Sequence, residues 1–419
     1  LDTAFGANGE ARYLILLQNR EEPRPSGGFP GTFAVVTVSN GQLSGYEIDN
    51  IYTLDQAYLA RRNQLVPAPG PIRAVLGQQE LLPHDAMWSP DFSEAARVFL
   101  SLYAETGWPP LTGVIGLTDS VIQQVLAVVG PYRIEVDGQH LTVTAESFMQ
   151  LIEAYRDLTW QDMAAHKRVV AILGDALIQQ VKAADFATKK RIYFALREAA
   201  DRRELQLYLS DPGMQAEVAR RGWDGAIQPV AGIPTMAMTV AGLTGGKKGL
   251  TIHASSTIEV TPSHGGTRIR WTVTLDHRGD PAGNEVYNGY EYAWLSLYLP
   301  EGARVIATSR PRAPEGVADD LRAVSFGIGI LPGTTQPVTI TFDLPAPAER
   351  LLIRRQAGFN DVAVRVRGTT GHCPMDWSFA LSHDYLVRLT DCIALPAQPD
   401  GKGVIRNEDA ILMVGALTH

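Results

Sequence analysis

One stretch near the start of the chain combines the residue types that bind anions. Residues 19–33 read NREEPRPSGGFPGTF and lie between two apolar runs. The planar guanidinium of Arg24 can hold a phosphate or a carboxylate with two parallel hydrogen bonds. Ser26 adds a hydroxyl, and Gly27 and Gly28 let backbone amides approach the same anion closely. We therefore predict a ligand-binding loop in which Arg24 is the anion anchor.

The length and charge of this stretch favour a functional loop over a simple turn. A β-hairpin turn has about two to five residues, whereas residues 19–33 form a much longer connection that carries several charges. The alternative is structural: Arg24 pairs with Glu22 or Asp91 and holds the loop, while the glycines serve only the turn. Residue types alone leave both interpretations open.

Three aspartates are candidates for cation binding or acid–base chemistry. Asp85 and Asp91 stand six residues apart before a predicted helix, so their carboxylates could share a cation or exchange protons. Asp49 ends a predicted strand, where open α/β sheets place ligand groups. We predict that Asp49 and Asp85 bind Mg²⁺ or another divalent cation, and that Arg24, Asp49 and Asp91 form the catalytic set. The alternatives are a helix cap for Asp91 and, for Asp49, a turn aspartate bonded to the backbone of Tyr52.

Two arginines on predicted helices, Arg156 and Arg168, complete the candidate binding set. The alternative is that they lie on solvated helix faces, as single surplus charges usually do. His84 and His166 are given no role, since most lone histidines are surface or structural residues. The sequence has no Gly-x-Ser-x-Gly motif, and Ser26 has no base adjacent in sequence. Phosphate-loop and dinucleotide fingerprints are also absent, so neither a hydrolase triad nor a nucleotide site is expected.

The composition indicates a globular chain that does not bind nucleic acid. The chain has 419 residues, 45% hydrophobic and 20% charged, which is enough for two or three domains. Its formal net charge is -8 and it has no basic run, whereas neutralising nucleic-acid phosphates requires clustered Lys and Arg. No window holds 18 consecutive apolar residues. The chain starts at Leu1 rather than Met, so we expect that a leader or anchor was removed or left out.

The two cysteines lie close together in the last fifth of the chain. Cys373 and Cys392 are separated by a strand-like run, and a disulfide that closes a loop of about 20 residues would contribute roughly 3 kcal/mol. We predict this pairing, with two buried free thiols as the alternative. A metal site is not expected there, because His372 offers only one further ligand.

Apolar periodicity divides the chain into two parts. In residues 1–225, short apolar runs alternate with segments of helical spacing, which predicts an α/β domain. In residues 250–419, short alternating runs separated by Gly, Pro, Asp and Asn predict an all-β, immunoglobulin-like sandwich. Residues 226–249 are predicted to connect the two domains. The predicted strands of the first domain are 13–17, 33–38, 43–48, 113–117 and 132–136, and its predicted helices are 93–105, 119–129, 145–156, 162–182 and 185–201.

Two motifs resemble those of an uncharacterised bacterial envelope family, known as domain of unknown function 4012. Its first signature, asparagine, glutamate, arginine-proline-threonine-glycine-glycine-phenylalanine, is matched in residues 19–29 with Ser26 in place of threonine. Its second, aspartate-alanine-asparagine-tryptophan-serine-proline-aspartate-phenylalanine, is matched in residues 85–92 with Met87 in place of asparagine. Further stretches that look like this family are 222–225, 245–247 and 356–358.

The order of elements in the N-terminal part is also similar to that of the LytR-CpsA-Psr phosphotransferases. These enzymes move cell-wall glycopolymers from a polyprenyl diphosphate carrier to the wall, with a divalent cation and several arginines. The resemblance implies a mixed sheet with flanking helices, with Arg24 after the first strand and Asp49 after the third. It places Arg156 and Arg168 in the later helical segments. Gly27 stands where that family has an aspartate, and no arginine precedes Asp49, so the metal- and phosphate-binding pattern is incomplete.

The two resemblances imply an extracellular or cell-envelope protein, membrane-anchored in its full-length precursor. It would bind or transfer a lipid-linked or cell-wall glycopolymer, and its partner would be a polyprenyl-linked or cell-wall glycan. As a glycopolymer phosphotransferase it would carry out displacement at a diphosphate, with a divalent cation neutralising the developing charge. The alternative is a non-catalytic surface protein that self-associates as a layer, sheath or filament component.

Overall fold

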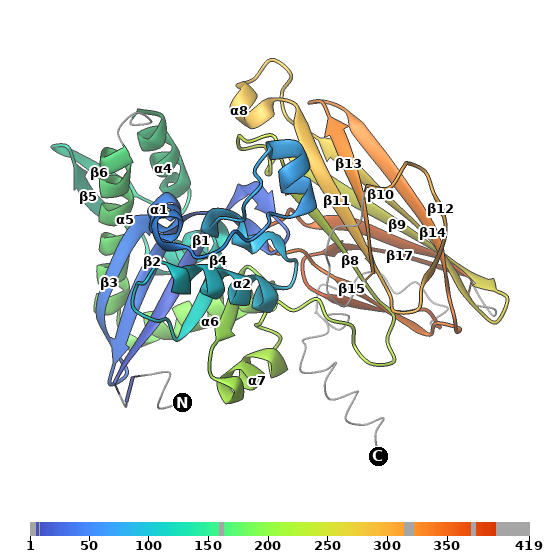
Figure 1. Cartoon of the computed structure of the whole chain (residues 1–419), viewed down its shortest axis with the longest axis horizontal. Coiled ribbons are helices and arrows are strands. Elements are labelled where there is room, and N and C mark those ends of the chain that lie inside the picture. The colour runs from blue at the N-terminus through green and yellow to red at the C-terminus, as the bar shows by residue number, and fades with distance from the viewer. Residues whose placement is uncertain (1–5, 8, 159–162, 314–321, 370–373, 391–419) are drawn as a thin grey trace.

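The chain folds into two halves that lie side by side (Figure 1). The structure is a computed structural model, and it describes residues 6–390 except 8, 159–162, 314–321 and 370–373. The N-terminal half combines a sheet with helices, and the C-terminal half consists mainly of strands. The coarse prediction of an α/β part followed by a strand-rich part is therefore confirmed. None of the helices described is long and apolar enough to cross a bilayer.

The N-terminal half is built around a five-stranded mixed sheet. Its strand order is β3-β2-β1-β4-β7, in which β1 and β4 are parallel and the other neighbours are antiparallel. Leu14 and Leu16 of the central strand β1 are fully buried, because helices pack on the face of the sheet to which they point. The strands are β1 (Glu10–Arg24), β2 (Gly27–Ser39), β3 (Gln42–Asn50), β4 (Gly113–Thr118) and β7 (Leu205–Leu209).

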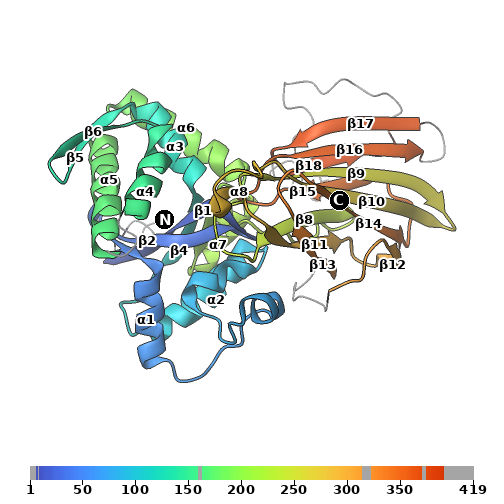
Figure 2. The same ribbon diagram turned by 90° about the horizontal axis from the view of Figure 1, so that it is seen from above.

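Helices cover both faces of this sheet, as Figure 2 shows. Leu14 and Leu16 point to one face, where they share a core with the apolar side chains of α1 and α2. The opposite face is covered by α3, α5 and α6. The helices are α1 (Ile51–Arg61), α2 (Phe92–Glu105), α3 (Asp119–Val129), α4 (Ser147–Leu158), α5 (Met163–Ala183), α6 (Phe186–Asp201) and α7 (Pro212–Arg220), with short turns η1 (Ile72–Leu76) and η2 (Pro83–Trp88) and a small hairpin of β5 (Tyr132–Val136) and β6 (Gln139–Val143).

Residues 19–33 do not form the predicted long loop. β1 and β2 make one hairpin whose pairing continues to Arg24 and Gly27, so its turn is only residues 25–26. The register shifts twice within residues 17–23. Such bulges let a strand accommodate extra residues and bend. The prolines and charges that are typical of a loop are therefore part of a distorted pair of strands, and the prediction of a long loop is wrong.

The end of this hairpin, residues 20–28, reaches the C-terminal half and is called the hairpin tip below. The side-chain amide of Gln356 donates to the carbonyl oxygen of Arg24 at 3.1 Å. Glu21 forms an ion pair with Lys247, with 3.4 Å between its Oε2 and the lysine Nζ. The hairpin tip is thus joined to the C-terminal half by an ion pair and a hydrogen bond.

The C-terminal half consists of two sheets that face each other. One has the order β12-β14-β10-β9-β16-β17 and the other β13-β11-β8-β15-β18. A single core lies between them and includes Trp271, Phe326 and Phe342. This arrangement is compatible with the predicted β-sandwich, while an immunoglobulin-like topology stays a prediction. The elements are β8 (Thr235–Gly242), β9 (Ile252–Ser263), β10 (Gly266–His277), α8 (Glu285–Asn288), β11 (Glu291–Leu299), β12 (Arg304–Thr308), β13 (Arg322–Ile330), β14 (Thr335–Leu344), β15 (Arg350–Arg354), β16 (Val362–Thr369), β17 (Pro374–Leu381) and β18 (Tyr385–Arg388).

The structure tests the predicted connection in this half but not the predicted disulfide. Residues 226–249, predicted as a connection, contain the central strand β8, whose residues are buried on both sides. A strand buried on both faces lacks the alternation that identifies half-buried strands. Cys373 and Cys392 lie outside the described residues, so their disulfide stays a prediction.

Candidate functional site

The hairpin tip meets the turn η2 in a buried set of charged side chains. Nη2 of Arg24 donates to Oδ1 of Asp85 at 3.4 Å, and Nη1 of Arg24 donates to the carbonyl oxygen of Gly242 at 3.2 Å. His84 lies between two carboxylates, with its Nδ1 2.6 Å from Oδ2 of Asp55 and its Nε2 3.1 Å from Oδ2 of Asp85. The result is a row of alternating charge, called the charge row below, which consists of Asp55, His84, Asp85 and Arg24.

Electrostatics keep His84 protonated within the charge row. Burial disfavours the imidazolium, but hydrogen bonds with Asp55 and Asp85 outweigh it and raise the pKa of His84 to about 9. Burial also opposes ionisation of Asp85, yet His84 and Arg24 lower the pKa of that carboxyl. A histidine that acts as a general base must be unprotonated at the working pH. His84 is therefore unsuited to that role near pH 7, and the charge row is a set of fixed charges.

Two aromatic rings lie against the charge row. The ring centroids of Phe29 and Tyr52 are 5.8 Å and 5.6 Å from that of His84, and the guanidinium carbon of Arg24 is 5.3 Å from the centroid of Phe29. The side chains of Arg24 and Asp85 are only 9% and 2% exposed. Arg24 therefore acts as a buried strut, which agrees with the structural alternative for the tip, although its partner is Asp85 and not the carboxylates named from the sequence.

The other predicted groups of the hairpin tip are used in close packing. A Cβ on Gly28 would lie 2.1 Å from a carbonyl oxygen of the paired strand β1. Gly27 has φ +147°, and a Cβ there would lie 2.5 Å from the side chain of Gln18. The hydroxyl of Ser26 donates to the carbonyl oxygen of Met87 at 2.9 Å. The glycines thus allow the hairpin to close, and Ser26 ties it to η2.

Asp49 and Asp91 stand at helix starts. Oδ1 of Asp49 accepts a hydrogen bond of 3.1 Å from the hydroxyl of Thr53 in α1. Asp91 is the N-cap of α2, where its Oδ1 accepts from the backbone amide of Glu94 at 3.2 Å. The side-chain amide of Gln228 donates to its other oxygen at 3.3 Å. The capping alternative for Asp91 is therefore correct.

The predicted cationic and metal-binding residues are dispersed. Arg168 forms an exposed ion pair of 3.2 Å with Asp137, in the turn between β5 and β6, and the side chain of Arg156 lies outside the described residues. Among the residues that the structure describes, no group of three or more His, Cys, Asp or Glu side chains could hold a metal ion. Asp85 pairs with Arg24 and His84, and its binding of a divalent cation together with Asp49 stays a prediction.

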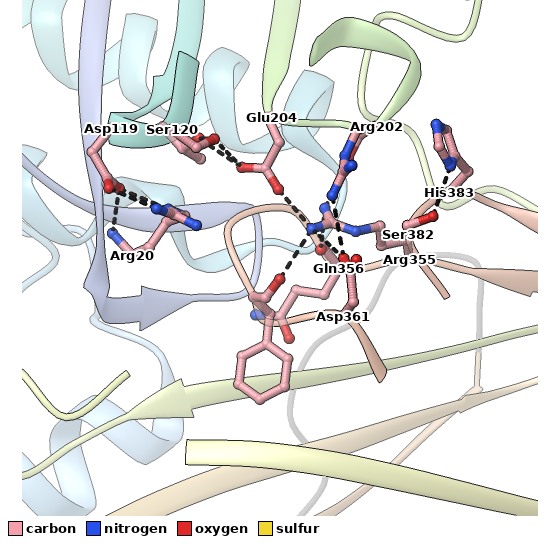
Figure 3. Close-up of polar contacts among 12 residues, drawn as sticks. Arg20, Asp119, Ser120, Arg202, Glu204, Arg355, Gln356, Asp361, Ser382 and His383 are labelled. Carbon is pink, nitrogen blue, oxygen red and sulfur yellow. Dashed lines mark hydrogen bonds and ion pairs between the residues drawn. The ribbon is translucent and has the colours of Figure 1, made fainter. Parts of the chain in front are cut away.

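A second set of buried ion pairs joins the two halves (Figure 3). Nη2 of Arg355 lies 2.7 Å from Oε1 of Glu204, and the hydroxyl of Thr118 donates to the other oxygen of Glu204 at 2.6 Å. Near the same place, Arg20 donates to both carboxylate oxygens of Asp119, at 3.0 Å and 2.9 Å. The Glu204–Arg355 pair connects the loop before β7 with a residue that follows β15, whereas the Arg20–Asp119 pair connects β1 with α3 inside the N-terminal half.

Asp384 anchors the same contact between the halves. Its Oδ2 lies 3.0 Å from Nη2 of Arg203 and 2.7 Å from Nη1 of Arg354. Burial opposes the charge of Asp384, but these two arginines outweigh it and lower its pKa to about 2. We call Arg203, Glu204, Arg354, Arg355 and Asp384 the interface clamp. Its charges are paired with one another, so it functions as a fastening and not as an open ligand site.

A cavity of about 790 Å³ is lined by residues of strands β3 and β4 and of helices α3, α5 and α6. This volume is within the range of small-molecule pockets. Nine of its lining residues are aliphatic, and two lysines, Lys182 and Lys189, belong to the lining as well. Nζ of Lys189 donates to the carbonyl oxygen of Lys182 at 3.0 Å. The residues that line the cavity are Gln42, Leu43, Leu117, Val121, Ile122, Val125, Leu177, Ile178, Val181, Lys182, Lys189 and Leu196.

This combination of groups suits an amphiphile. Most of the aliphatic lining residues are partly exposed, so a hydrocarbon chain could remove their surface from water. The ammonium groups of Lys182 and Lys189 could attract an anionic head group. The charge row contains residues of α1 and η2 and therefore belongs to the other side of the sheet. A ligand in the cavity would therefore be held by residues other than those predicted.

A second hollow, of about 870 Å³, lies on the outer face of the six-stranded sheet. Its lining includes Arg268, Arg270 and Arg367. Arg268 pairs with Asp343 at 2.8 Å, while Arg270 and Arg367 pair with Glu259 at 3.5 Å and 2.6 Å. These arginines are balanced by carboxylates, which makes the hollow a weaker candidate for an anionic ligand.

Three features of the structure were not predicted from the sequence, namely the roles of His84 and Asp55 in the charge row and the cavity. His84 directly precedes the motif of residues 85–92, and this adjacency of a histidine and an aspartate was the available signal. Asp55 is 29 residues away from His84, and only the packing of α1 on η2 brings the two together. The cavity left a signal in the aliphatic positions of α3 and α5, but helical spacing does not distinguish a pocket lining from a closed core.

Comparison with known proteins supports one of the predicted relationships. Residues 8–155 match the family model described as "Protein of unknown function (DUF4012)", so the predicted relationship to this family is confirmed over that stretch. No curated protein matches the chain.

Several solved structures show a distant likeness. A transcriptional regulator from Enterococcus faecalis is 14% identical, with 52% of this chain and 73% of that chain covered and a TM-score of 0.30. A Listeria innocua protein is 12% identical, with coverage of 54% and 86% and a TM-score of 0.30. TagV from B. subtilis is 12% identical, with coverage of 51% and 80% and a TM-score of 0.27. At such scores the likeness carries no argument about fold or activity.

Proposed function

We propose that this chain binds a lipid-linked glycopolymer precursor at the bacterial cell envelope. The precursor's hydrocarbon chain would occupy the cavity beneath α3, α5 and α6, and its phosphate or diphosphate would lie beside Lys182 and Lys189. The observation that carries this proposal is the cavity itself, in which nine aliphatic residues and two lysines share one lining. The resemblance of the N-terminal half to the LytR-CpsA-Psr enzymes points to the same class of ligand.

The energetics of such a site favour a long apolar chain. Each methylene group buried from water contributes about 0.8 kcal/mol, so a prenyl chain of several units could bind through burial alone. The lysines would add attraction and orient the head group toward solvent, where the glycan could extend without entering the protein.

Binding is better supported than transfer of the glycopolymer. A phosphotransferase requires cations free to orient the leaving phosphate, whereas Arg24 is engaged with Asp85 and a carbonyl oxygen. Asp91 is used as a helix cap. The protein would therefore hold or present the precursor. The proposal does not include a divalent cation.

Titration calorimetry with geranylgeranyl diphosphate as a water-soluble probe tests the proposal. We expect saturable binding by the wild-type chain. Exchange of Ile178→Trp should fill the cavity and weaken binding at least tenfold. The control Ile306→Trp introduces the same ring on β12 of the other half, where Ile306 is exposed, and should leave binding unchanged.

A second comparison separates the head group from the chain. Lys182→Glu should weaken binding of the diphosphate but not that of the uncharged alcohol geranylgeraniol, because only the diphosphate interacts with the lysine. If the wild-type chain binds neither probe, or if Ile178→Trp binds both as tightly as wild type, the cavity is not a lipid site and the proposal is rejected.

A further inference from the structure

The outer face of α6 carries large aromatic side chains in contact with solvent. Phe186, Tyr193 and Phe194 are 83%, 52% and 47% exposed. Phe186 and Tyr193 are seven residues apart, so they lie on the same side of the helix. The opposite side of α6 packs on the protein through Ile192 and Ala199, which are buried. Exposing three aromatic rings on one helix is unfavourable unless another apolar phase covers them.

The same face of α6 is positively charged. Nζ of Lys190 and the guanidinium carbon of Arg197 each lie 5.9 Å from the ring centroid of Phe194. Lys189 and Arg191 add two more cations elsewhere on α6, while Glu198 and Asp201 add two carboxylates, and Asp201 pairs with Arg197 at 4.0 Å. With four cations and two carboxylates, α6 has a net positive charge, whereas the formal net charge of the whole chain is -8. The charge of α6 is therefore opposite to that of the chain as a whole.

We infer that α6 docks the protein on the surface of an anionic lipid bilayer. Aromatic rings are favoured at the boundary between lipid chains and water, and lysine and arginine beside them are attracted to lipid phosphates. A helix with both groups on its outer face matches that boundary. A second copy of the chain would bring the same positive charges together, so charge complementarity favours anionic lipid as the occupant.

The docking face of α6 lies next to the cavity, which agrees with an orientation in which α6 faces the bilayer. Lys189 and Leu196 of α6 both belong to the lining of the cavity, so a docked α6 would bring the cavity close to the bilayer surface. The inference goes beyond the proposed function, because the docking face is exposed whether or not the cavity binds a lipid-linked precursor. Its test uses vesicles without any prenyl lipid, so the two ideas can fail separately.

Vesicle sedimentation with the full chain tests the docking face. The vesicles contain either phosphatidylcholine alone or equal parts of phosphatidylcholine and phosphatidylglycerol. We expect at least tenfold stronger binding to the phosphatidylglycerol vesicles and loss of that difference in 0.5 M NaCl, because salt screens surface charges. The combined exchange Phe186→Ser, Tyr193→Ser and Phe194→Ser should reduce binding at least tenfold, and Lys190→Glu should reduce it severalfold.

Matched controls show whether the effect belongs to α6. Tyr290→Ser removes a comparably exposed ring from the C-terminal half, and Arg133→Glu reverses an exposed charge on β5. Both variants should bind vesicles as wild type does. The inference is overturned if the triple variant binds like wild type, if the controls lose as much binding, or if the wild type does not pellet with either vesicle. It is also overturned if light scattering shows a wild-type dimer that the triple variant breaks while vesicle binding stays unchanged.

Discussion

Replacing His84 with glutamine should remove one cation from the charge row without a large change in size. His84 faces Asp55 and Asp85 through its two ring nitrogens, with the rings of Phe29 and Tyr52 beside it. A glutamine amide is neutral and presents its donors at a single nitrogen. The variant would therefore leave two buried carboxylates with Arg24 as the main compensating charge of the row.

The pKa of His84 sets the expected magnitude. It rises from 6.5 to about 9 in the folded chain. A rise of this size corresponds to about 3 kcal/mol. Because the pKa is higher in the folded state, this stability is fully present below about pH 6.5 and is lost as the pH rises through about 9. We expect His84→Gln to lower the free energy of unfolding by about 3 kcal/mol at pH 6, and the difference from wild type to shrink toward zero above pH 9.

Urea unfolding at a series of pH values between 6 and 10 measures this difference. Tryptophan fluorescence reports the transition, and the control is His264→Gln, which changes an exposed histidine in the turn between β9 and β10. The control should follow wild type at every pH. A His84→Gln variant whose deficit stays constant from pH 6 to pH 10 would show that His84 is not held as an imidazolium, and the electrostatic account of the charge row would be refuted.

Two further substitutions test the buried ion pairs. Arg24→Lys keeps the charge but loses the planar fork that reaches Asp85 and Gly242; we expect a loss of about 1–3 kcal/mol in unfolding free energy, while the exposed Arg168→Lys stays within about 0.5 kcal/mol of wild type. Equal melting temperatures for both variants would contradict the strut role of Arg24. Asp384→Asn should cost about 3–5 kcal/mol in urea unfolding, because it leaves the interface clamp with uncompensated buried arginines. The contribution of Asp384 is present above its ordinary pKa of 3.8 and disappears as the pH falls through about 2, so an acid titration in which wild type and variant differ equally at pH 2 and pH 5 would contradict this assignment.

Much of the secondary structure could be predicted from local pattern. The strands at 113–117 and 132–136 and the helix at 119–129 agree with β4, β5 and α3, because their apolar residues recur at the spacing of one buried face. Strands were not predicted where their side chains are not buried on one face only. β8 is covered on both faces, and the strands of the hairpin tip are interrupted by bulges, so neither shows the period of two that identifies a strand.

Local sequence pattern was enough to predict most of the strands and helices with one buried face and the strand-rich second half, and residues 8–155 match a family model. The roles of the charged groups, in contrast, depend on long-range packing. Arg24 meets Asp85, 61 residues away, and Glu204 meets Arg355 across the contact between the halves. The cavity likewise requires three helices and a sheet to leave space between them. Spacing along the chain controls local geometry, whereas partner, burial and pKa depend on groups that are distant in sequence and meet only when the chain packs.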